Sequence, residues 1–272
     1  MAKDIQHQNI SFQPSEINHL YGEKVHVLSS PLMLSLLAQL GSPQTTQPRI
    51  NELVSMLYSH LIDYVIDSFF PKKQVSLETR MINHHPQAVY EGQVVDPQVR
   101  VVTVDLARAG TLPSHLCYSK LNYLMSPELV RQDHFYVARV TDAEGKVTGV
   151  NISGSKIGGD IEDSIVLFPD PMGATGGTIV ECYHHYLNKV GGKPKLVIAM
   201  HLIITPEYLA RVTKECPDLH IFALRLDRGL SSSDILKEVP GKYWDQEKGL
   251  SPIQYIVPGA GGLGEILNNS YC

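Results

Sequence analysis

The chain has 272 residues, of which 43% are hydrophobic, and its formal net charge at pH 7 is −5. A chain of this length can bury a sizeable core within one large domain. No long cluster of lysine and arginine occurs, so a nucleic-acid groove is not expected as the main function. The composition is compatible with a phosphorylated ligand, since backbone amides and a divalent metal can hold phosphates without a basic surface.

The cysteines and the apolar runs bear on the compartment. The N-terminus is polar and is not a secretory signal, and the longest apolar run, residues 196–205, is too short to span a bilayer. We therefore expect a cytoplasmic protein without a membrane partner and with reduced, mostly buried thiols. The four cysteines are far apart and include no CxxC pair; they are Cys117, Cys182, Cys216 and Cys272.

The first third of the chain predicts an arm, a helix and a hairpin. Residues 1–20 look like an irregular arm. Residues 51–70 carry apolar side chains at helical spacing, and Pro71 ends this helix. Two short strands that can pair as a hairpin follow, at residues 74–80 and 87–95.

From residue 99 the pattern changes to alternating strands and helices. Ser126 is expected to cap a helix with Pro127 at its first position, and Thr205 to open a later helix that Pro217 stops. Ala143-Glu144-Gly145 is a plausible hairpin turn between two strands. The alternation indicates a parallel sheet with right-handed crossovers. The predicted strands cover residues 99–106, 133–141, 146–153, 164–170, 196–205 and 219–227.

The turn after the buried strand 164–170 carries the functional argument. It reads Asp170-Pro-Met-Gly-Ala-Thr-Gly-Gly-Thr178 and lies where ligands bind in such sheets, outside the carboxyl ends of the strands. Gly176 and Gly177 let the backbone approach a ligand closely, and we expect both to adopt backbone conformations closed to other residues. The helix that begins at about Thr178 turns its free amides toward the turn. We expect a phosphate cradle here, with Asp170 placed to reach sugar hydroxyls; the alternative is an ordinary tight strand-to-helix turn.

This loop resembles the phosphoribosyl pyrophosphate loop of the uracil phosphoribosyltransferases, which have one Asp followed by Pro-Met. Leu106-Ala-Arg-Ala-Gly110 is similar to the family turn whose arginine contacts pyrophosphate, and this role would fall to Arg108. Arg139 stands where the family has a second pyrophosphate-binding arginine. The resemblance places phosphoribosyl pyrophosphate on Arg108, Arg139, Asp170, Pro171, Met172, Gly173, Ala174, Thr175, Gly176, Gly177, Thr178 and Gly262. The catalytic residues that it implies are Asp170, Arg108 and Arg139.

The resemblance continues to the end of the chain and covers roughly residues 24–268. Leu226-Asp-Arg-Gly-Leu230 and Tyr255-Ile-Val-Pro-Gly259 match the family segment that closes over uracil, with Ile256 and Gly261 as backbone readers. The uracil site that it implies consists of Met172, Ala174, Tyr255, Ile256, Gly261, Gly262 and Leu263. The implied fold is α/β: a type I phosphoribosyltransferase-like parallel sheet flanked by helices, with an N-terminal helical arm and a hairpin or hood over the base site.

The resemblance also implies boundaries and partners. We divide the chain into an arm, residues 1–23, and a phosphoribosyltransferase domain, residues 24–272, with an insertion in the hood at about 231–251 that holds Trp244. The implied reaction transfers a 5-phosphoribosyl group from phosphoribosyl pyrophosphate to uracil, giving UMP and pyrophosphate. Mg2+ is the implied cofactor, with ligands in the chain left unknown, and a homo-oligomer, dimer or tetramer, is the implied assembly.

The chain departs from the family at one residue of the base segment. Where the family usually reads Gly-Asp-Ala-Gly-Asp, this chain reads Gly261-Gly-Leu-Gly-Glu265. The first family Asp, near pyrophosphate and metal, is therefore Gly262, while Glu265 keeps the second acidic position. Two alternatives stay open: a non-catalytic or weakly active homologue that binds phosphoribosyl pyrophosphate or a nucleotide as a regulator, and the same chemistry on another base.

Two other groups of potential ligands are not expected to bind a metal. Neighbouring histidines on a helix point about 100° apart and make poor co-ligands, which argues against His184 and His185. The acidic residues Asp160, Glu162 and Asp163 are interpreted as a solvated bend before a strand.

Overall fold

The computed structural model describes residues 4–141 and 147–270, without side chains for residues 139–141 and 147–148. Its centre is an eight-stranded sheet in the order β1-β10-β9-β7-β4-β5-β6, and β8 pairs with β9. All pairs are parallel except β5 with β6. The strands are β1 (Val25–Val27), β4 (Val101–Ala107), β5 (Val130–Thr141), β6 (Val147–Lys156), β7 (Ile165–Pro169), β8 (Met172–Gly173), β9 (Leu196–Ile204) and β10 (Leu219–Leu226).

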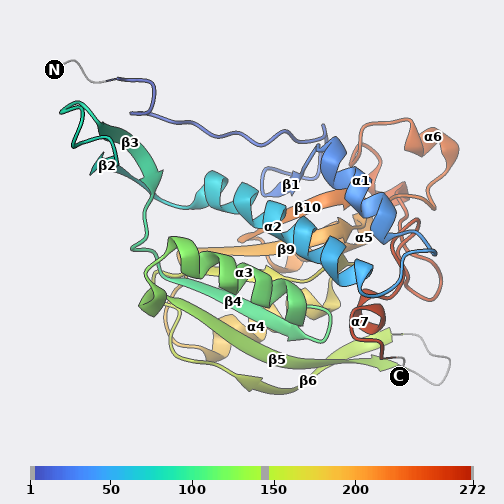
Figure 1. The fold of residues 1–272 in the computed structure, drawn as a ribbon. Coiled ribbons are helices and arrows are strands. Elements are labelled where there is room, and N and C mark those ends of the chain that lie inside the picture. Colours follow the sequence, from blue (N-terminus) through green and yellow to red (C-terminus); the bar gives the residue numbers. More distant parts are fainter. Residues whose placement is uncertain (1–3, 142–146, 271–272) are drawn as a thin grey trace.

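Helices cover both faces of this sheet (Figure 1). One face carries α1 (Pro31–Leu40), α2 (Arg49–Phe69) and α3 (Thr111–Leu124), and the other carries α4 (Gly177–Lys189) and α5 (Pro206–Glu215). The shorter helices are η1 (Pro127–Leu129), α6 (Ser233–Leu236), η2 (Trp244–Gln246) and α7 (Leu263–Ile266).

The sheet divides the hydrophobic core into two layers. Successive residues of a strand point to opposite faces, and β7 shows this directly: Leu167 joins the layer with α2 and α3, whereas Val166 and Phe168 join the layer with α4. All three side chains are at most 1% exposed. Burial on both faces explains why this strand reads as a continuous apolar run.

The predicted strands are confirmed within one to three residues at their ends, and the long helix occupies residues 49–69 as its periodicity indicates. The helix predicted at Ser126 is wrong, because only the three-residue η1 follows it. The Ser126 hydroxyl accepts a hydrogen bond from the Gln98 side chain at 2.7 Å and caps nothing. The turn predicted at 143–145 lies outside the described residues.

The predicted hairpin lies apart from the main sheet, and the N-terminal arm runs from it to β1, where the Ile17 amide donates to the Val27 carbonyl at 3.0 Å (Figure 1). Strands β2 (Lys72–Glu78) and β3 (Val89–Val95) form an antiparallel pair. The arm runs along this pair, where the Gln93 amide donates to the His7 carbonyl at 2.8 Å. The hairpin prediction is confirmed, and residues 5–20 form neither helix nor strand apart from one isolated bridge.

The inserted segment 231–251 is fastened to the body by buried polar contacts. Arg228 Nη1 lies 2.8 Å from Glu247 Oε1, and the Tyr21 hydroxyl donates to the other oxygen of the same carboxylate. Trp244 Nε1 donates to the Pro206 carbonyl at 2.9 Å, and its ring packs edge-on against Tyr21. The insertion is therefore held between the arm and the start of α5.

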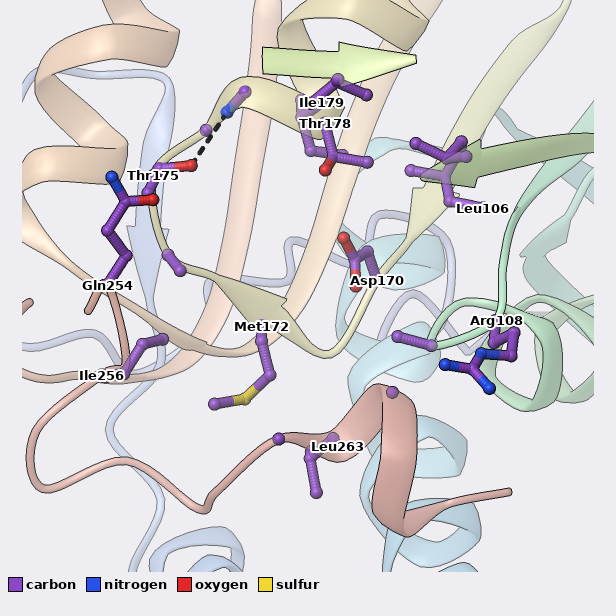
Figure 2. Close-up of a pocket in the computed structure, with 18 of the residues that line it drawn as sticks. Leu106, Arg108, Asp170, Met172, Thr175, Thr178, Ile179, Gln254, Ile256 and Leu263 are labelled. Atoms are coloured by element: carbon purple, nitrogen blue, oxygen red, sulfur yellow. Dashed lines mark hydrogen bonds between the residues drawn. The ribbon is translucent and has the colours of Figure 1, made fainter. Parts of the chain in front are cut away.

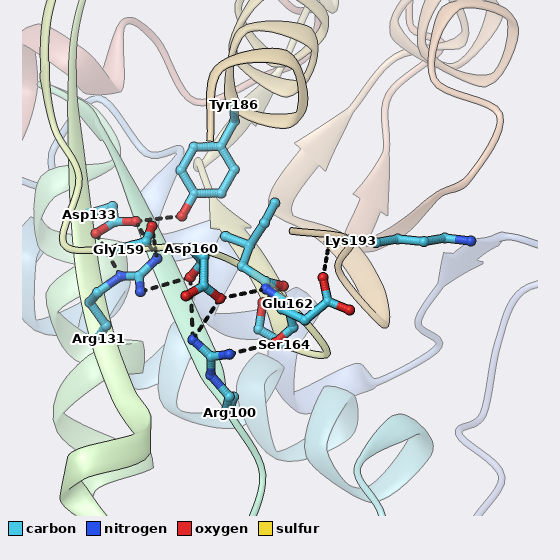
Figure 3. Close-up of polar contacts among 10 residues, drawn as sticks. Arg100, Arg131, Asp133, Gly159, Asp160, Glu162, Ser164, Tyr186 and Lys193 are labelled. Atoms are coloured by element: carbon cyan, nitrogen blue, oxygen red, sulfur yellow. Dashed lines mark hydrogen bonds and ion pairs between the residues drawn. The ribbon is translucent and has the colours of Figure 1, made fainter. Parts of the chain in front are cut away.

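The acidic bend at 160–163 is organised by two arginines (Figure 3). Arg131 makes a two-point ion pair with Asp133, at 2.9 and 3.0 Å, and also donates to the Asp160 carbonyl at 3.0 Å. Arg100 pairs with the Asp160 carboxylate at 3.0 Å.

Within the described part of the chain no cluster of three or more potential ligands could hold a metal, and no helix there is long and apolar enough to cross a membrane.

The two arginines of this bend should differ in their effect on stability. Asp133 is fully buried, so Arg131→Ala leaves a buried carboxylate without its ion-pair partner and should lower the free energy of unfolding by about 3 kcal/mol. Arg100→Ala is the matched control, because its ion pair is exposed and should contribute much less. Urea unfolding of both variants measures the difference; equal losses would show that the Asp133 pair is not the stronger contact.

Candidate functional site

A cavity of about 620 Å3 lies at the carboxyl ends of β4 and β7 (Figure 2). Three segments form most of its wall: residues 106–109 at the end of β4 and in the turn that follows, the loop after β7, and residues of the C-terminal segment 254–265. None of the described residues of 231–251 lines it. The cavity thus joins parts of the chain that lie about 150 positions apart.

The loop after β7 has the shape of an anion cradle. Gly176 adopts a left-handed conformation, with φ of 77°, and is the residue before the first turn of α4. A side chain there would be strained and would also meet Val212 at 2.8 Å. Gly177 has no positive φ, so the expectation of a special backbone conformation holds for Gly176 only.

Carbonyl groups of this loop accept hydrogen bonds from His201 in β9 and from Thr205, the residue before α5. The Thr205 amide donates to the Gly173 carbonyl at 3.1 Å, and the Thr205 hydroxyl donates to the Ala174 carbonyl at 2.7 Å. His201 Nδ1 lies 2.6 Å from the Asp170 carbonyl. With these carbonyls turned toward β9 and α5, the amides of residues 175, 176 and 178, which donate to no protein acceptor among the described residues, are available to an anion at the helix N-terminus.

Most of the predicted ligand-binding residues line this one cavity. Those that do are Arg108, Asp170, Met172, Ala174, Thr175, Gly176, Gly177, Thr178, Tyr255, Ile256, Gly261, Gly262 and Leu263. Pro171 and Gly173 are buried beneath the loop instead of lining the cavity. The Pro171 carbonyl accepts from the amides of Leu202 and Ile203, and Gly173 leaves room for the Tyr208 ring.

The two predicted arginines stand differently. Arg108 follows a cis peptide after Ala107, is exposed at the cavity, and donates to the Ser270 hydroxyl. Arg139 lies in β5 opposite Val150, which lines the cavity. The Arg139 side chain lies outside the described residues.

An ion pair that the sequence analysis did not single out holds the backbone of the C-terminal wall in place. Arg225 and Asp227, at the end of β10, form a two-point pair at 2.6 and 2.8 Å. Asp227 accepts from the Gly259 amide at 2.7 Å, and Arg225 donates to the Gly259 carbonyl at 3.0 Å. Both backbone polar groups of Gly259, which belong to the two peptide units on either side of its α-carbon, are thereby fixed, and this sets the path of the residues that follow. The indication that the sequence offers is an arginine and an aspartate two positions apart at the end of a predicted strand.

Gly262 and Glu265 compete for one place in the wall. The backbone of Gly262, with φ of −81°, is open to other residues. A β-carbon there would nevertheless collide with Glu265 Oε2. The Glu265 carboxylate therefore occupies the space above Gly262, and with Asp170 it is one of two carboxylates among the residues that line the cavity.

Gln254 is a further wall residue that the sequence did not predict. It has a positive φ of 64°, and its side chain lies beside Thr175 (Figure 2). Its buried Oε1 has no hydrogen-bond partner among the described residues. Left-handed backbone is uncommon for a residue other than Gly or Asn, and nothing in the local sequence indicates it.

A glycine-containing loop and a helix N-terminus at the carboxyl end of a strand, facing a C-terminal segment across a cavity, form the arrangement in which α/β proteins commonly bind phosphorylated ligands. The chain belongs to the uracil phosphoribosyltransferase family, whose model matches residues 27–246. The fold prediction, α/β and type I phosphoribosyltransferase-like, is confirmed together with the family.

Individual relatives agree with this family. The uracil phosphoribosyltransferase of Shouchella clausii is 27% identical over 250 residues, which cover 90% of this chain and 97% of the relative. That of Thermococcus sibiricus is 26% identical and covers 89% of both chains. The solved structure of a protein from Aquifex aeolicus is similar in fold, with a TM-score of 0.66 at 20% identity over 90% of this chain and 97% of that one.

His201 makes the stability of the protein depend on pH. Burial lowers the pKa of His201 to about 4, whereas a histidine in the unfolded chain titrates near 6.5. Between these values the unfolded chain binds a proton that the folded protein does not. Stability is therefore complete above the unfolded pKa and falls as the pH drops toward 4, by up to about 3 kcal/mol from this residue.

Urea unfolding at pH 7 and at about pH 5 measures this effect. The parent protein should lose more free energy of unfolding between the two values than His201→Val, which has no group to titrate. The same loss in both proteins would mean that His201 does not carry the dependence.

Proposed function

We propose that this protein transfers the 5-phosphoribosyl group of phosphoribosyl pyrophosphate to N1 of uracil, forming UMP and pyrophosphate. Membership of the family supports this function. The observation that carries it is the single cavity in which a loop with turned-away carbonyls faces a C-terminal segment with a fixed backbone. A sugar phosphate and a planar base need those two kinds of wall.

In this proposal the chain acts mainly by positioning and by charge. Within the loop 174–178, the amides of residues 175, 176 and 178 and the hydroxyls of Thr175 and Thr178 anchor the 5-phosphate at the N-terminus of α4. Asp170 holds the ribose hydroxyls and favours the positive charge that develops at the anomeric carbon as pyrophosphate leaves. Arg108 and Arg139 stabilise the charge of the leaving group. No general base is required, since positioning of the two substrates lowers the barrier by itself.

Mg2+ fits the donor set of the cavity. Magnesium is usually held by one or two carboxylates together with substrate phosphates, not by a cage of protein ligands. Glu265 is the carboxylate that we assign to it, and Asp170 is kept for the ribose. Bound there, the ion would neutralise the pyrophosphate that leaves.

The base would be read by backbone groups of Ile256 and Gly261, between Met172 and Leu263. Of residues 231–256, the segment expected to close over the base, only 254–256 line the cavity, because the insertion 231–251 is fastened elsewhere. We therefore assign the exclusion of water to the short turn 251–256, whose Ile253 and Tyr255 are exposed.

The assembly and the compartment remain predictions. The hairpin β2–β3 is a two-stranded sheet, which is marginal on its own, and it exposes 54% of Leu77. These features support a homo-oligomer, dimer or tetramer. The described cysteines, Cys117, Cys182 and Cys216, are buried free thiols, which supports the cytoplasm as the place of action.

The proposed reaction is tested by incubating the protein with phosphoribosyl pyrophosphate, Mg2+ and a panel of free bases. Pyrophosphate release should occur with uracil, and UMP should be the product identified by mass. Release with another base but not with uracil would contradict the proposed substrate. Tight binding of the sugar pyrophosphate without any product would favour the regulatory alternative.

The place shared by Gly262 and Glu265 predicts a reciprocal rescue. Glu265→Ala should lower kcat/KM by at least about tenfold, because loss of a group that only supports a metal ligand already costs about 10–100-fold, and Glu265 is assigned to the ion itself. Gly262→Asp alone should bring no gain, since two carboxylates would then compete for one position. The double variant Gly262→Asp/Glu265→Ala should recover most of the loss.

Steady-state kinetics and calorimetric binding of phosphoribosyl pyrophosphate with and without Mg2+ measure these three variants. Full activity in Glu265→Ala would contradict the assignment of the carboxylate to the metal. A gain in Gly262→Asp alone would show instead that Gly262 leaves a real deficit in the parent protein.

A further inference from the structure

We propose that His201 and Tyr208, which the proposed reaction does not use, are positioning residues that hold Asp170 and the phosphate loop in their binding geometry. Both side chains pack behind the loop, and Tyr208 also borders the cavity. The inference rests on the proposed function for its kinetic consequences and on the geometry for the rest. It adds a supporting pair to the residues that would touch the substrate.

The pair forms one continuous hydrogen-bonded chain. Tyr208, in the first turn of α5, has its hydroxyl 2.6 Å from His201 Nε2. His201, in β9, has Nδ1 2.6 Å from the Asp170 carbonyl. Both side chains are fully buried. A link therefore runs from α5 through the sheet to the first residue of the loop.

The protonation pattern of this chain has one solution. A carbonyl oxygen can only accept, so Nδ1 of His201 carries the hydrogen. The imidazole is neutral in its buried site, as its lowered pKa indicates, so Nε2 has only a lone pair and accepts from the Tyr208 hydroxyl. Each group thus has one role, and the ring cannot turn over without breaking both bonds.

Tyr208 also supports the middle of the loop by packing. A β-carbon at Gly173 would lie 3.1 Å from the Tyr208 ring and 2.8 Å from Ile204. The Tyr208 amide donates to the Thr205 hydroxyl, which in turn donates to the Ala174 carbonyl. The same tyrosine therefore acts on the loop at its start, through His201, and at its centre.

A role in filling the core would not require these polar groups. The β9 sequence LVIAMHLII has His201 as its only polar residue, and an apolar side chain there would avoid the cost of burying imidazole. What the imidazole adds is a directed donor to the carbonyl of the residue whose carboxylate faces the cavity. Asp170 is then held on both sides of its α-carbon, because its amide donates to the Met200 carbonyl at 3.1 Å.

The test compares two double variants that differ only in this donor. His201→Val/Tyr208→Phe removes the whole chain and leaves no unpaired hydroxyl. His201→Asn/Tyr208→Phe also lacks the hydroxyl, but its side-chain amide nitrogen stands near the position of Nδ1 and can donate to the Asp170 carbonyl. Tyr186→Phe is the control for loss of a buried tyrosine hydroxyl, since Tyr186 contacts Asp133, away from the loop.

The measurements are the affinity for ribose 5-phosphate by calorimetry, kcat and KM for both substrates, and the melting temperature. We expect the Val/Phe variant to bind ribose 5-phosphate about tenfold more weakly, with a raised KM for phosphoribosyl pyrophosphate and an unchanged KM for uracil. The Asn/Phe variant should stay within about threefold of the parent. Tyr186→Phe should lower the melting temperature without changing either affinity.

Equal affinities and equal kinetics in the two double variants would overturn the proposal and leave the pair as core packing. Should the Val/Phe variant fail to fold, Tyr208→Phe alone decides: parent-like binding of ribose 5-phosphate overturns the proposal, and weaker binding supports it. If the parent forms no UMP, the proposed function fails, while the ribose 5-phosphate comparison still tests the pair. A parent that binds no ribose 5-phosphate contradicts both.

Discussion

Hydrogen bonds to the backbone carbonyls of the loop after β7 are the constraint on which the site depends. Amides and carbonyls alternate along any chain, so a loop can present several amides to an anion only if its carbonyls are satisfied elsewhere. Here β9 and the first turn of α5 accept that task through His201 and Thr205. Because α5 begins where β9 ends, one strand-to-helix junction supports the next one along the sheet.

The same principle explains why the C-terminal segment needs no secondary structure to be well placed. Asp227 and Arg225 take both polar groups of Gly259 from the end of β10. The inserted residues that precede this segment are tied to the arm and to α5 through Glu247 and Trp244. A long insertion is tolerated here because its ends stay where β10 requires them, and closing a longer loop adds little entropy cost.

The sequence predicted what is local and missed what joins distant residues. Each strand and the phosphate loop is a single contiguous segment of sequence, and nine successive residues, 170–178, are enough to predict the cradle. The Ser-Pro signal was ambiguous: it opens the ten-residue α1 at Ser30 but only three residues of η1 at Ser126. Apolar residues of α1 are buried in the core, whereas η1 leads directly into strand β5. Tertiary packing therefore determines whether a full helix follows the Ser-Pro pair. Contacts such as His201 with Asp170 or Glu265 above Gly262 depend on the folded chain and left no local pattern.

The geometry of the cavity follows from the spacing of two strands. Hydrogen bonds hold the phosphate loop against β9 and the C-terminal segment against the end of β10. The two strands are parallel neighbours, with Leu226 opposite Ile204. Neighbouring strands lie about 4.8 Å apart, and this separation is fixed by the hydrogen bonds of the sheet. The hydrogen-bonded sheet therefore fixes the position of the two cavity walls relative to each other. The side chains that carry the chemistry can then sit on short, exposed turns without losing their relative positions.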